Sequence, residues 1–439
     1  MKITFLGAGS TVFVRNIIGD CMFVPALRDA EFALYDIDAS RLEESKFILE
    51  GIRTVMGAHC TFTCYCGEEK RKDALRGASF VVCAVQVGGY KPSTVIDFAI
   101  PNKYGLGQTI GDTTGIGGIM RGLRTIPVLE SFARDMEEVC PDALFMNYSN
   151  PMNILSGYIQ KYTSMKTVGL CHSVQVCAKN LFKRLNMSEY WEGRQEKIFG
   201  INHMAWLLEI KDKDGNDLYP EIRRRVAAHE YDDDCGDLVR FDYIRNLGYY
   251  CTESSVHHAE YNPFYIKKNY PELIERFKIP LDDYLRRCER NINRWRTEYE
   301  QIKAGATQER ERSREYGSRI MEAVATDVPF TFNGNVLNTG FLVANLPEKA
   351  CVEVPIIADG KGLHPQKMGE LPLQCAALCM GRVNVDLLTI EAAHSHKLED
   401  VYHAAMFDPH TAAELDIDSI KKMVDELIEA HGDYLPKFH

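Results

Sequence analysis

The amino-acid sequence predicts an α/β fold in which an N-terminal, doubly wound parallel sheet precedes a second domain of mixed α+β structure. In the first third of the chain, short apolar runs that end in turn residues alternate with helical patterns, as in βαβ units with right-handed crossovers. After about residue 175 this alternation gives way to charged helices and to strands joined by Asn/Gly turns. We therefore expect two domains, residues 1–175 and residues 176–439.

The parallel sheet is expected to contain a series of short, buried strands, because each apolar run is bounded by residues that favour turns. The predicted strands are Ile3–Leu6, Phe32–Tyr35, Phe80–Val85, Leu144–Tyr148 and Thr167–Leu170.

Helical patterns separate these strands. Apolar residues at Ile48, Ile52, Val55 and Met56 recur at the spacing of one helix face. The same spacing runs from Leu129 to Cys140, after which Pro141 ends the helix.

The second domain contains both kinds of pattern. Residues 270–325 have a charged helical pattern, and residues 329–358 have the composition of strands joined by tight turns. Near the C-terminus a helical face is predicted by Ile420, Met423, Val424, Leu427 and Ile428.

The composition is that of a soluble globular protein. The 439 residues are 45% hydrophobic and 26% charged, which is enough apolar material for a sizeable core. The formal charge is -11, and without a long Lys/Arg run we expect neither nucleic acid nor an anionic membrane as a partner. Because no signal peptide, uncharged 18-residue span or Cys-x-x-Cys pattern is apparent, we expect a cytoplasmic protein whose 14 cysteines are mostly free thiols.

The first predicted strand runs into Gly7-Ala8-Gly9-Ser10-Thr11, a turn of the kind that binds a dinucleotide. Two glycines at this spacing permit close approach of a pyrophosphate to the next helix, which either hydroxyl residue could cap. Val12 replaces the third glycine of the fingerprint. The second strand ends near Asp36, where a carboxylate would bind the ribose diol of NAD and repel the 2′-phosphate of NADP. A plain strand–helix turn and a solvated carboxylate are the alternatives, but together these features favour a Rossmann-like domain that binds NAD.

Polar residues also follow the later strands, at the edge where open α/β sheets bind ligands. Asn150 precedes a proline after the fourth strand, and Cys171-His172-Ser173 follows the fifth. Asp112 lies in a Gly-rich stretch between the third and fourth strands, and His203 follows a predicted turn. Each has an ordinary structural explanation, as a turn-forming residue, a small core residue or a histidine at a strand end. A thiolate with an imidazole would by itself suggest zinc or iron rather than a harder ion.

Taken as a set, these motifs resemble glycoside hydrolase family 4. The resemblance extends from Met1 to about Tyr434. The Cys-His-Ser-Val sequence is similar to that of the bacterial α-galactosidase branch, whereas relatives that act on 6-phosphosugars carry Asp or Asn with Met-Pro after the Cys, and α-glucosidase-like relatives carry Cys-His-Gly. The residues that match are Gly7-x-Gly9-Ser10, Asp36-Ile37-Asp38, Asn150-Pro151, Cys171-His172-Ser173-Val174, Asn202-His203, Asn345-Leu346-Pro347 and Val352-Glu353-Val354-Pro355.

The resemblance implies a hydrolase of terminal α-galactosides, of the melibiose or raffinose type, that uses NAD and a divalent metal, usually Mn2+. It also implies a second domain like that of lactate and malate dehydrogenases. In this family, NAD transiently takes a hydride from C3 of the sugar, a base removes the C2 proton and a general acid protonates the glycosidic oxygen as it leaves. Water then adds at C1, and the hydride returns to C3.

The resemblance also implies roles for individual residues. Cys171 and His203 correspond to the metal ligands, and Asn150 to a residue that contacts the substrate. His172 matches the position of the general acid, and Asp112 matches an acidic residue near the metal.

The base at C2 stays open. In relatives it is an Asp or Tyr in the segment that matches Thr252–Tyr261, but the ungapped register places Ser254 there, which cannot deprotonate carbon. Glu253 and Tyr261 are the two available candidates. The family also implies a homodimer or homotetramer.

Other functions fit parts of the sequence. An α-glucosidase or α-galacturonidase would belong to the same family. An NAD-dependent 2-hydroxy acid dehydrogenase would need a His–Asp pair and an arginine to clamp the substrate carboxylate, for which Arg121 and Arg124 are available but no His–Asp arrangement fits. An NAD-responsive sensor would bind without turnover, which the polar clusters at several strand ends disfavour.

Overall fold

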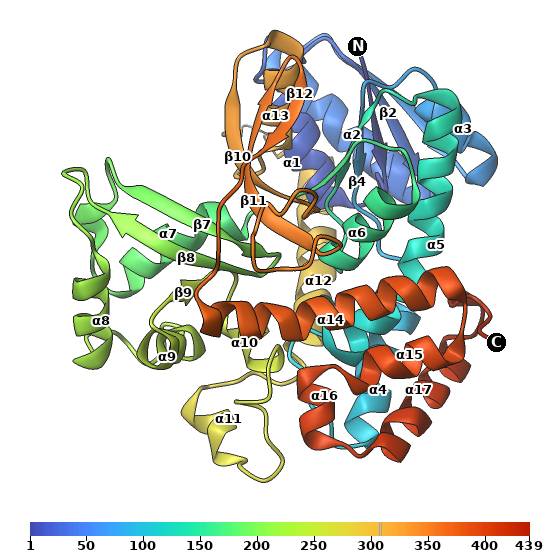
Figure 1. The fold of residues 1–439 in the computed structure, drawn as a ribbon. Coiled ribbons are helices and arrows are strands. Elements are labelled where there is room, and N and C mark those ends of the chain that lie inside the picture. Colours follow the sequence, from blue (N-terminus) through green and yellow to red (C-terminus); the bar gives the residue numbers. More distant parts are fainter. Residues whose placement is uncertain (307, 309) are drawn as a thin grey trace.

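The computed structural model describes residues 1–306, 308 and 310–439, apart from the side chain of Thr11 (Figure 1). One 12-stranded sheet runs through the molecule. Its strand order is β3-β2-β1-β4-β5-β6-β10-β11-β7-β8-β9, and β12 pairs with β11. The first six strands in this order are parallel, and the others are antiparallel to their neighbours.

The parallel part confirms the five predicted strands, with small differences at their ends. A further strand, β3, escapes prediction because it lies at the edge of the sheet and its side chains are largely half exposed, so no continuous apolar run marks it. The six strands are β1 (Lys2–Leu6), β2 (Glu31–Asp36), β3 (Thr61–Cys66), β4 (Phe80–Cys83), β5 (Leu144–Asn147) and β6 (Thr167–Gly169).

Helices cover both faces of these strands and form two cores. Side chains of β1 alternate between them, with Ile3 and Phe5 packing on the side of α1 and α2 and Leu6 on the side of α5 and α6. The predicted face with Ile48 and Ile52 lies on α2, where both residues are buried, although Val55 is exposed. These helices are α1 (Thr11–Cys21), α2 (Ala39–Met56), α3 (Arg71–Leu75), α4 (Val95–Lys103), α5 (Gly115–Val139), α6 (Met152–Tyr162) and α7 (Ser173–Arg184).

The antiparallel part continues the sheet beyond β6. The strands expected within 329–358 are β10 and β11, whereas the hairpin of β7 and β8 is a finding of the structure. This hairpin belongs to the green lobe at the left of Figure 1. The strands are β7 (Gln195–Ile201), β8 (Met204–Lys211), β9 (Tyr250–Cys251), β10 (Phe330–Leu337), β11 (Cys351–Asp359) and β12 (Gly362–Pro365).

The remaining helices surround this part and pack back onto the first. Within 270–325 the structure has α11, α12 and all but the last residue of α13, while Thr307 and Glu309 lie outside the described residues. The predicted C-terminal helix is α17, with Leu427 in the core. The helices are α8 (Tyr219–Ala227), α9 (Leu238–Leu247), α10 (Ser255–Glu260), α11 (Glu272–Arg276), α12 (Asp283–Lys303), α13 (Gly317–Thr326), α14 (Leu373–Ser395), α15 (Leu398–Met406), α16 (Pro409–Glu414) and α17 (Ile417–His431).

Helix α14 is long and apolar enough, by composition alone, to cross a membrane. Half of its apolar window is buried in this structure, and it packs against α5, α6 and α15. Arg382 and Asp386 lie buried on it. Its composition is therefore also that of a core helix.

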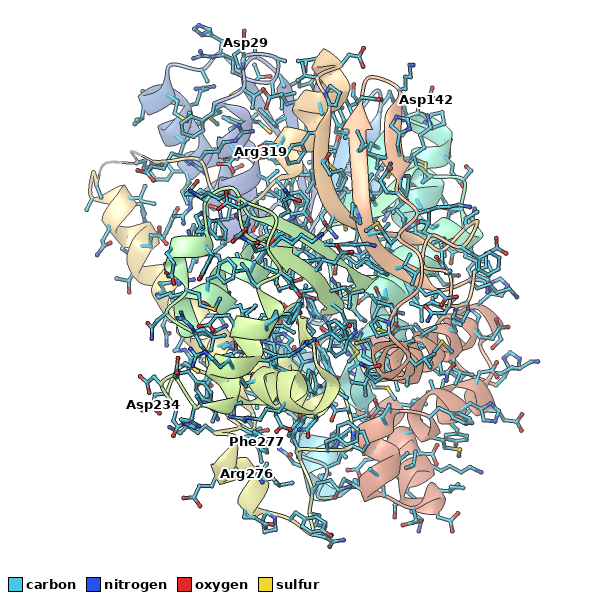
Figure 2. The ribbon with its side chains drawn as sticks, turned by 60° about the vertical axis from the view of Figure 1, so that its left-hand side comes forward. Asp29, Asp142, Asp234, Arg276, Phe277 and Arg319 are labelled. Atoms are coloured by element: carbon cyan, nitrogen blue, oxygen red, sulfur yellow. The ribbon has the colours of Figure 1, made fainter. Side chains whose placement is uncertain are left out.

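The parallel strands all point into the middle of the molecule. Asp29 and Asp142, which precede β2 and β5, lie at one end in Figure 2, while Arg276 and Phe277 lie at the other. The carboxyl ends of the strands therefore face the second half of the chain, and residues from both halves can meet there.

Candidate functional site

The turn after β1 has the geometry of a dinucleotide-binding loop. The N–H groups of Gly7 and Ala8 donate to the carbonyl oxygen of Tyr35 at 3.0 and 2.9 Å. A Cβ at Gly7, where φ is +85°, would lie 2.5 Å from the carbonyl oxygen of Ala84, so only glycine fits. The backbone is therefore bare beside the N-terminus of α1, where a pyrophosphate would bind.

Asp36 lies beside this turn, as expected of a ribose-binding carboxylate. Its Oδ2 accepts a hydrogen bond from the Gly9 N–H at 2.7 Å, and its Oδ1 accepts one from the Asp38 N–H at 3.1 Å. Ser10 holds the N-cap position of α1 but makes no side-chain cap bond. Thr11 begins α1, and its side chain lies outside the described part of the chain. The bare turn with its adjacent carboxylate fits NAD.

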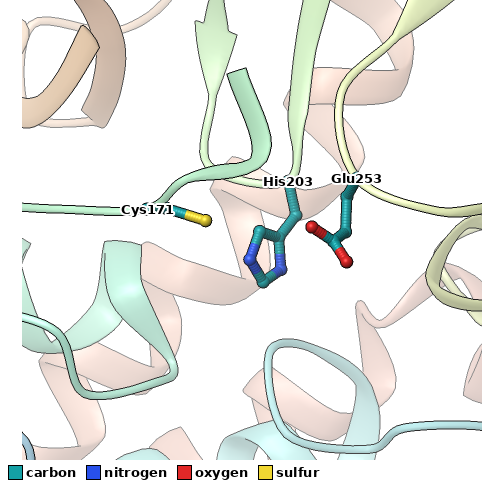
Figure 3. A group of neighbouring side chains, drawn as sticks. All are labelled: Cys171, His203 and Glu253. Atoms are coloured by element: carbon teal, nitrogen blue, oxygen red, sulfur yellow. The ribbon is translucent and has the colours of Figure 1, made fainter. Parts of the chain in front are cut away.

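Cys171, His203 and Glu253 come from three separate segments and converge. Cys171 follows β6, His203 lies in the turn between β7 and β8, and Glu253 follows β9. The thiol sulfur, a ring nitrogen and a carboxylate oxygen all lie within 4.8 Å of one another. Figure 3 shows the His203 ring between the other two side chains. We call these three residues the ligand cluster.

Two residues of the ligand cluster have left-handed backbones, with φ of 62° at His203 and 64° at Glu253. Such a conformation costs a non-glycine residue about 1–3 kcal/mol and persists only where the surroundings enforce it. At His203 they do, because Arg382 of α14 donates to the Asn202 carbonyl at 3.1 Å and the Asn202 N–H donates to Asn153 of α6 at 3.3 Å.

The protonation of the ligand cluster suits a divalent cation. Burial lowers the pKa of His203 to about 4, so the imidazole is neutral and can offer a lone pair. Burial alone would raise the pKa of Glu253, but His257 and His203 outweigh it and bring the pKa to about 2. Burial and the carboxylates of Glu353 and Glu253 raise the pKa of the Cys171 thiol. A cation at the cluster would favour its thiolate form, so this donor set fits a metal.

A polar network links the ligand cluster to three other residues that were predicted to belong to the site. The Nδ1 atom of His203 lies 3.2 Å from the Tyr261 hydroxyl and 3.2 Å from the Thr113 hydroxyl. The Thr113 hydroxyl donates to Asp112 at 2.6 Å, and the Asn150 amide donates to the same carboxylate at 3.3 Å. Asp112, Asn150 and Tyr261 are thus brought together around His203.

His172 lies at the rim of this region. Its side chain is 52% exposed, and its Nδ1 lies 3.8 Å from a carboxylate oxygen of Glu315. Among the described residues it makes no side-chain hydrogen bond to the ligand cluster or to the network around Asp112. The predicted acid is therefore next to Cys171 in the chain, but its side chain faces outward.

Three buried residues near the ligand cluster escape assignment from sequence. His257 lies 3.2 Å from Glu253, and the guanidinium of Arg382 lies 4.6 Å from the centre of the Tyr261 ring. Glu353 is fully buried, and burial raises its pKa to about 8. Glu353 belongs to a motif that resembles the family, and a charged residue such as Arg382 in a largely apolar helix is also a signal. No signal in the sequence marks His257.

The arginines that a 2-hydroxy acid dehydrogenase would use are already engaged. Arg124 forms a buried, bidentate pair with Asp97 at 3.0 and 2.6 Å. Arg121 donates to the Asn150 carbonyl at 3.1 Å and to the Tyr284 hydroxyl at 3.2 Å. Neither guanidinium presents a free fork for a substrate carboxylate.

Sequence comparison identifies the family. Residues 2–187 match the profile of "Family 4 glycosyl hydrolase" and residues 198–411 match "Family 4 glycosyl hydrolase C-terminal domain". The chain is 56% identical over 437 residues to an alpha-galactosidase of Bacillus subtilis (strain 168), covering 100% of this chain and 99% of that protein. It is 35% identical over 453 residues to an alpha-galactosidase of Rhizobium meliloti (strain 1021), covering 100% and 89%.

Solved structures support the fold. A 6-phospho-alpha-glucosidase from gut microorganisms, in complex with NAD and Mn2+, superposes with a TM-score of 0.82 at 21% identity, covering 100% of this chain and 99% of that one. Malate dehydrogenase from Plasmodium falciparum gives a TM-score of 0.50 at 14% identity, covering 90% and 99%. These likenesses confirm the predicted Rossmann-like α/β architecture and its similarity in fold to malate dehydrogenase. Since the two profiles match most of the chain and the relatives are similar over its whole length, the chain belongs to glycoside hydrolase family 4.

Proposed function

We propose that this chain hydrolyses terminal α-galactosides, with NAD and a divalent metal, Mn2+ being the expected ion. The ligand cluster is the observation that carries the proposal, because thiol, imidazole and carboxylate lie within 4.8 Å of one another. The 56% identity to the Bacillus subtilis alpha-galactosidase favours galactosides over glucosides and galacturonides.

The two cofactors, when bound, supply reversible oxidation at C3 of the sugar and an electrophile for the oxygens at C2 and C3. Cys171, His203 and Glu253 would hold the metal. Asn150 and Asp112, which hydrogen-bond to each other, would orient the sugar hydroxyls next to it.

We assign the base at C2 to Tyr261 rather than to Glu253. Glu253 lies among the metal ligands, where its carboxylate is needed to balance the charge of the ion. The Tyr261 hydroxyl lies 3.2 Å from His203, so it faces the same space without belonging to the ligand cluster. His172, half exposed beside Cys171, would protonate the leaving oxygen where the aglycone meets solvent.

The activity test uses p-nitrophenyl α-galactoside with NAD, Mn2+ and a thiol reductant. The α-glucoside, the α-galacturonide and the 6-phosphate analogues are the comparison substrates. We expect the α-galactoside to be preferred, solvent deuterium to enter at C2, and no net NADH to accumulate. Preference for another glycoside would assign a different specificity within the family, and NADH production from malate or lactate would point to a dehydrogenase. Full activity in protein stripped of dinucleotide would overturn the mechanism.

Two variants separate the proposed roles of ligand and base. Cys171→Ser should weaken the response to Mn2+, because a serine hydroxyl is a far poorer anionic ligand than a thiolate. Tyr261→Phe should abolish exchange at C2 while leaving Mn2+ binding within about threefold, since the base is not a ligand. Unchanged Mn2+ dependence in Cys171→Ser, or exchange at the full rate in Tyr261→Phe, would refute the respective assignment.

We also propose a cytoplasmic homodimer or homotetramer whose two domains meet near residues 175 and 176. Gel filtration with light scattering tests the oligomer, and limited proteolysis tests the boundary.

A further inference from the structure

Helix α12 runs across the carboxyl edge of the parallel sheet and touches several elements that surround the Gly7–Gly9 turn. Near its start, Tyr284 accepts a hydrogen bond from Arg121 of α5 at 3.2 Å. One turn further, Glu289 accepts a hydrogen bond from Tyr90 in the loop after β4 at 2.9 Å.

The second half of α12 contacts the first two helices of the chain. Trp295 donates to Glu44 of α2 at 3.3 Å, and Glu298 pairs with Arg15 of α1. Tyr299 packs edge-on against Phe47 of α2, with 6.1 Å between ring centres. The helix therefore runs from the loop after β4 toward α1 and α2. A dinucleotide in a Rossmann-like domain follows the same line, from its nicotinamide end to its adenosine end.

One face of α12 has a gap in its packing. Residues at a spacing of three or four share a helix face, and this spacing places Ile292 on the inward stripe. The other members of the stripe are partly buried, but Ile292 is 39% exposed although it lies between the contacts made by Glu289 and Trp295. The inward members are Tyr284, Cys288, Ile292, Trp295, Tyr299 and Ile302.

Exposed apolar residues also border the dinucleotide turn itself. Ile37, directly after Asp36, is 77% exposed, and Val12, in the place of the third fingerprint glycine, is 40% exposed. A single exposed apolar side chain needs no explanation, but these two flank the carboxylate and the turn that a dinucleotide would contact.

We propose that α12 is the outer wall of the dinucleotide site and that Ile292 packs against bound NAD, opposite the Gly7–Gly9 turn and Asp36. This inference rests on the proposed use of NAD. The proposal adds a helix from the second half of the chain to the NAD site. The dinucleotide fingerprint lies wholly in the first half and gives no indication of this helix. NAD would then bury Ile292 and tie α12 to α1 and α2.

The test is calorimetric titration of the charcoal-treated full chain with NAD, with no substrate present. Ile292→Asp should raise the Kd of NAD about tenfold or more, because it replaces an apolar contact by a charge that repels the pyrophosphate. Ile417→Asp is the matched control, since Ile417 is also an exposed isoleucine, lies at the start of α17 and should leave the Kd unchanged. Because both side chains are exposed, urea unfolding should show both variants folded.

Tryptophan fluorescence gives a second, independent readout. The chain has 3 tryptophans, and Trp295 lies on the inward stripe of α12. NAD should change the emission of the wild type, and Trp295→Phe should remove most of that change.

The possible outcomes distinguish a failure of this inference from a failure of the proposed use of NAD. Wild-type protein that binds no NAD would overturn both. Wild-type protein that binds NAD, with Ile292→Asp binding equally well, would overturn the role of α12 alone. An NAD-dependent emission change that persists in Trp295→Phe would also count against it.

Discussion

Glu260 holds the loop that carries Asp112, and its replacement by glutamine should damage both stability and catalysis. The buried carboxylate accepts backbone hydrogen bonds from Thr109 at 2.6 Å, Ile110 at 3.2 Å and Gly111 at 2.9 Å. The first two bonds go to Oε2 and the third goes to Oε1. Asp112 is the next residue in the chain.

The expected cost follows from these contacts. Glutamine retains one oxygen, so its NH2 group must face at least one of the three backbone N–H groups. A buried donor left without an acceptor costs about 1–3 kcal/mol. Burial raises the pKa of Glu260 to about 7, because a charge at this site is itself unfavourable. Glutamine carries no charge, so its substitution offsets part of the cost of the unpaired donor. We expect Glu260→Gln to lower the free energy of unfolding by about 1–2 kcal/mol.

The effect on turnover should exceed the effect on substrate binding. Asp112 reaches His203 through the Thr113 hydroxyl, so a loop displaced by about 1 Å would disturb the reacting geometry and cost about 10²-fold in rate. Urea unfolding measures the first effect, and kcat and KM for p-nitrophenyl α-galactoside measure the second. Glu272→Gln, at an exposed position on α11, is the control and should change neither. If Glu260→Gln matched the control in both unfolding and kcat, Glu260 would not position the loop.

Further predictions concern buried titratable groups outside the ligand cluster. Burial lowers the pKa of His258 to about 3 from 6.5, so below pH 6.5 this histidine binds a proton in the unfolded chain but not in the folded one. The free energy of unfolding therefore keeps its full value above pH 6.5. It falls as the pH drops toward 3, by up to about 1.4 kcal/mol per pH unit. His258→Gln should keep a donor for the Thr252 carbonyl, and its urea midpoint should fall less steeply between pH 6.5 and pH 4 than that of the wild type. Parallel curves for the two proteins would contradict the role of His258 in this pH dependence. Asp97→Ala leaves Arg124 buried without its partner and should cost about 3–5 kcal/mol in urea unfolding. Asp142→Ala is the control: because its carboxylate is fully exposed, the midpoint of urea unfolding should stay the same, and an equal loss in both variants would refute the argument.

The parallel strands could be predicted from the sequence because burial on both faces produces short, nearly continuous apolar runs. β4 and β5 are buried at every position, and their boundaries are predicted closely. β3 and the β7–β8 hairpin have mixed burial patterns, so their residues resemble those of loops.

The candidate site could be predicted only in part. Gly7, Asp36 and Cys171 stand at strand ends, where local sequence and family resemblance both point to chemistry. Glu253 belongs to the ligand cluster, whereas Tyr261 contacts His203 from outside it. No local sequence pattern distinguishes these two positions. Both residues lie in the same short segment, and only the fold around α10 decides which of them lies in the cluster and which contacts His203 from beside it.

The sequence by itself determined the alternation of strands and helices, the dinucleotide turn and the family to which the chain belongs. These features depend on side-chain periodicity and on motifs of residues close together in the chain. They can therefore be recognised without knowing how distant segments pack. The tertiary structure alone decided the partners of those motifs: the carboxylate that joins Cys171 and His203, the buried Glu260 that holds the Asp112 loop, and the helix α12 that crosses the sheet edge. Such contacts join residues far apart in the chain, and they arise because packing of the whole core sets which distant backbones approach one another.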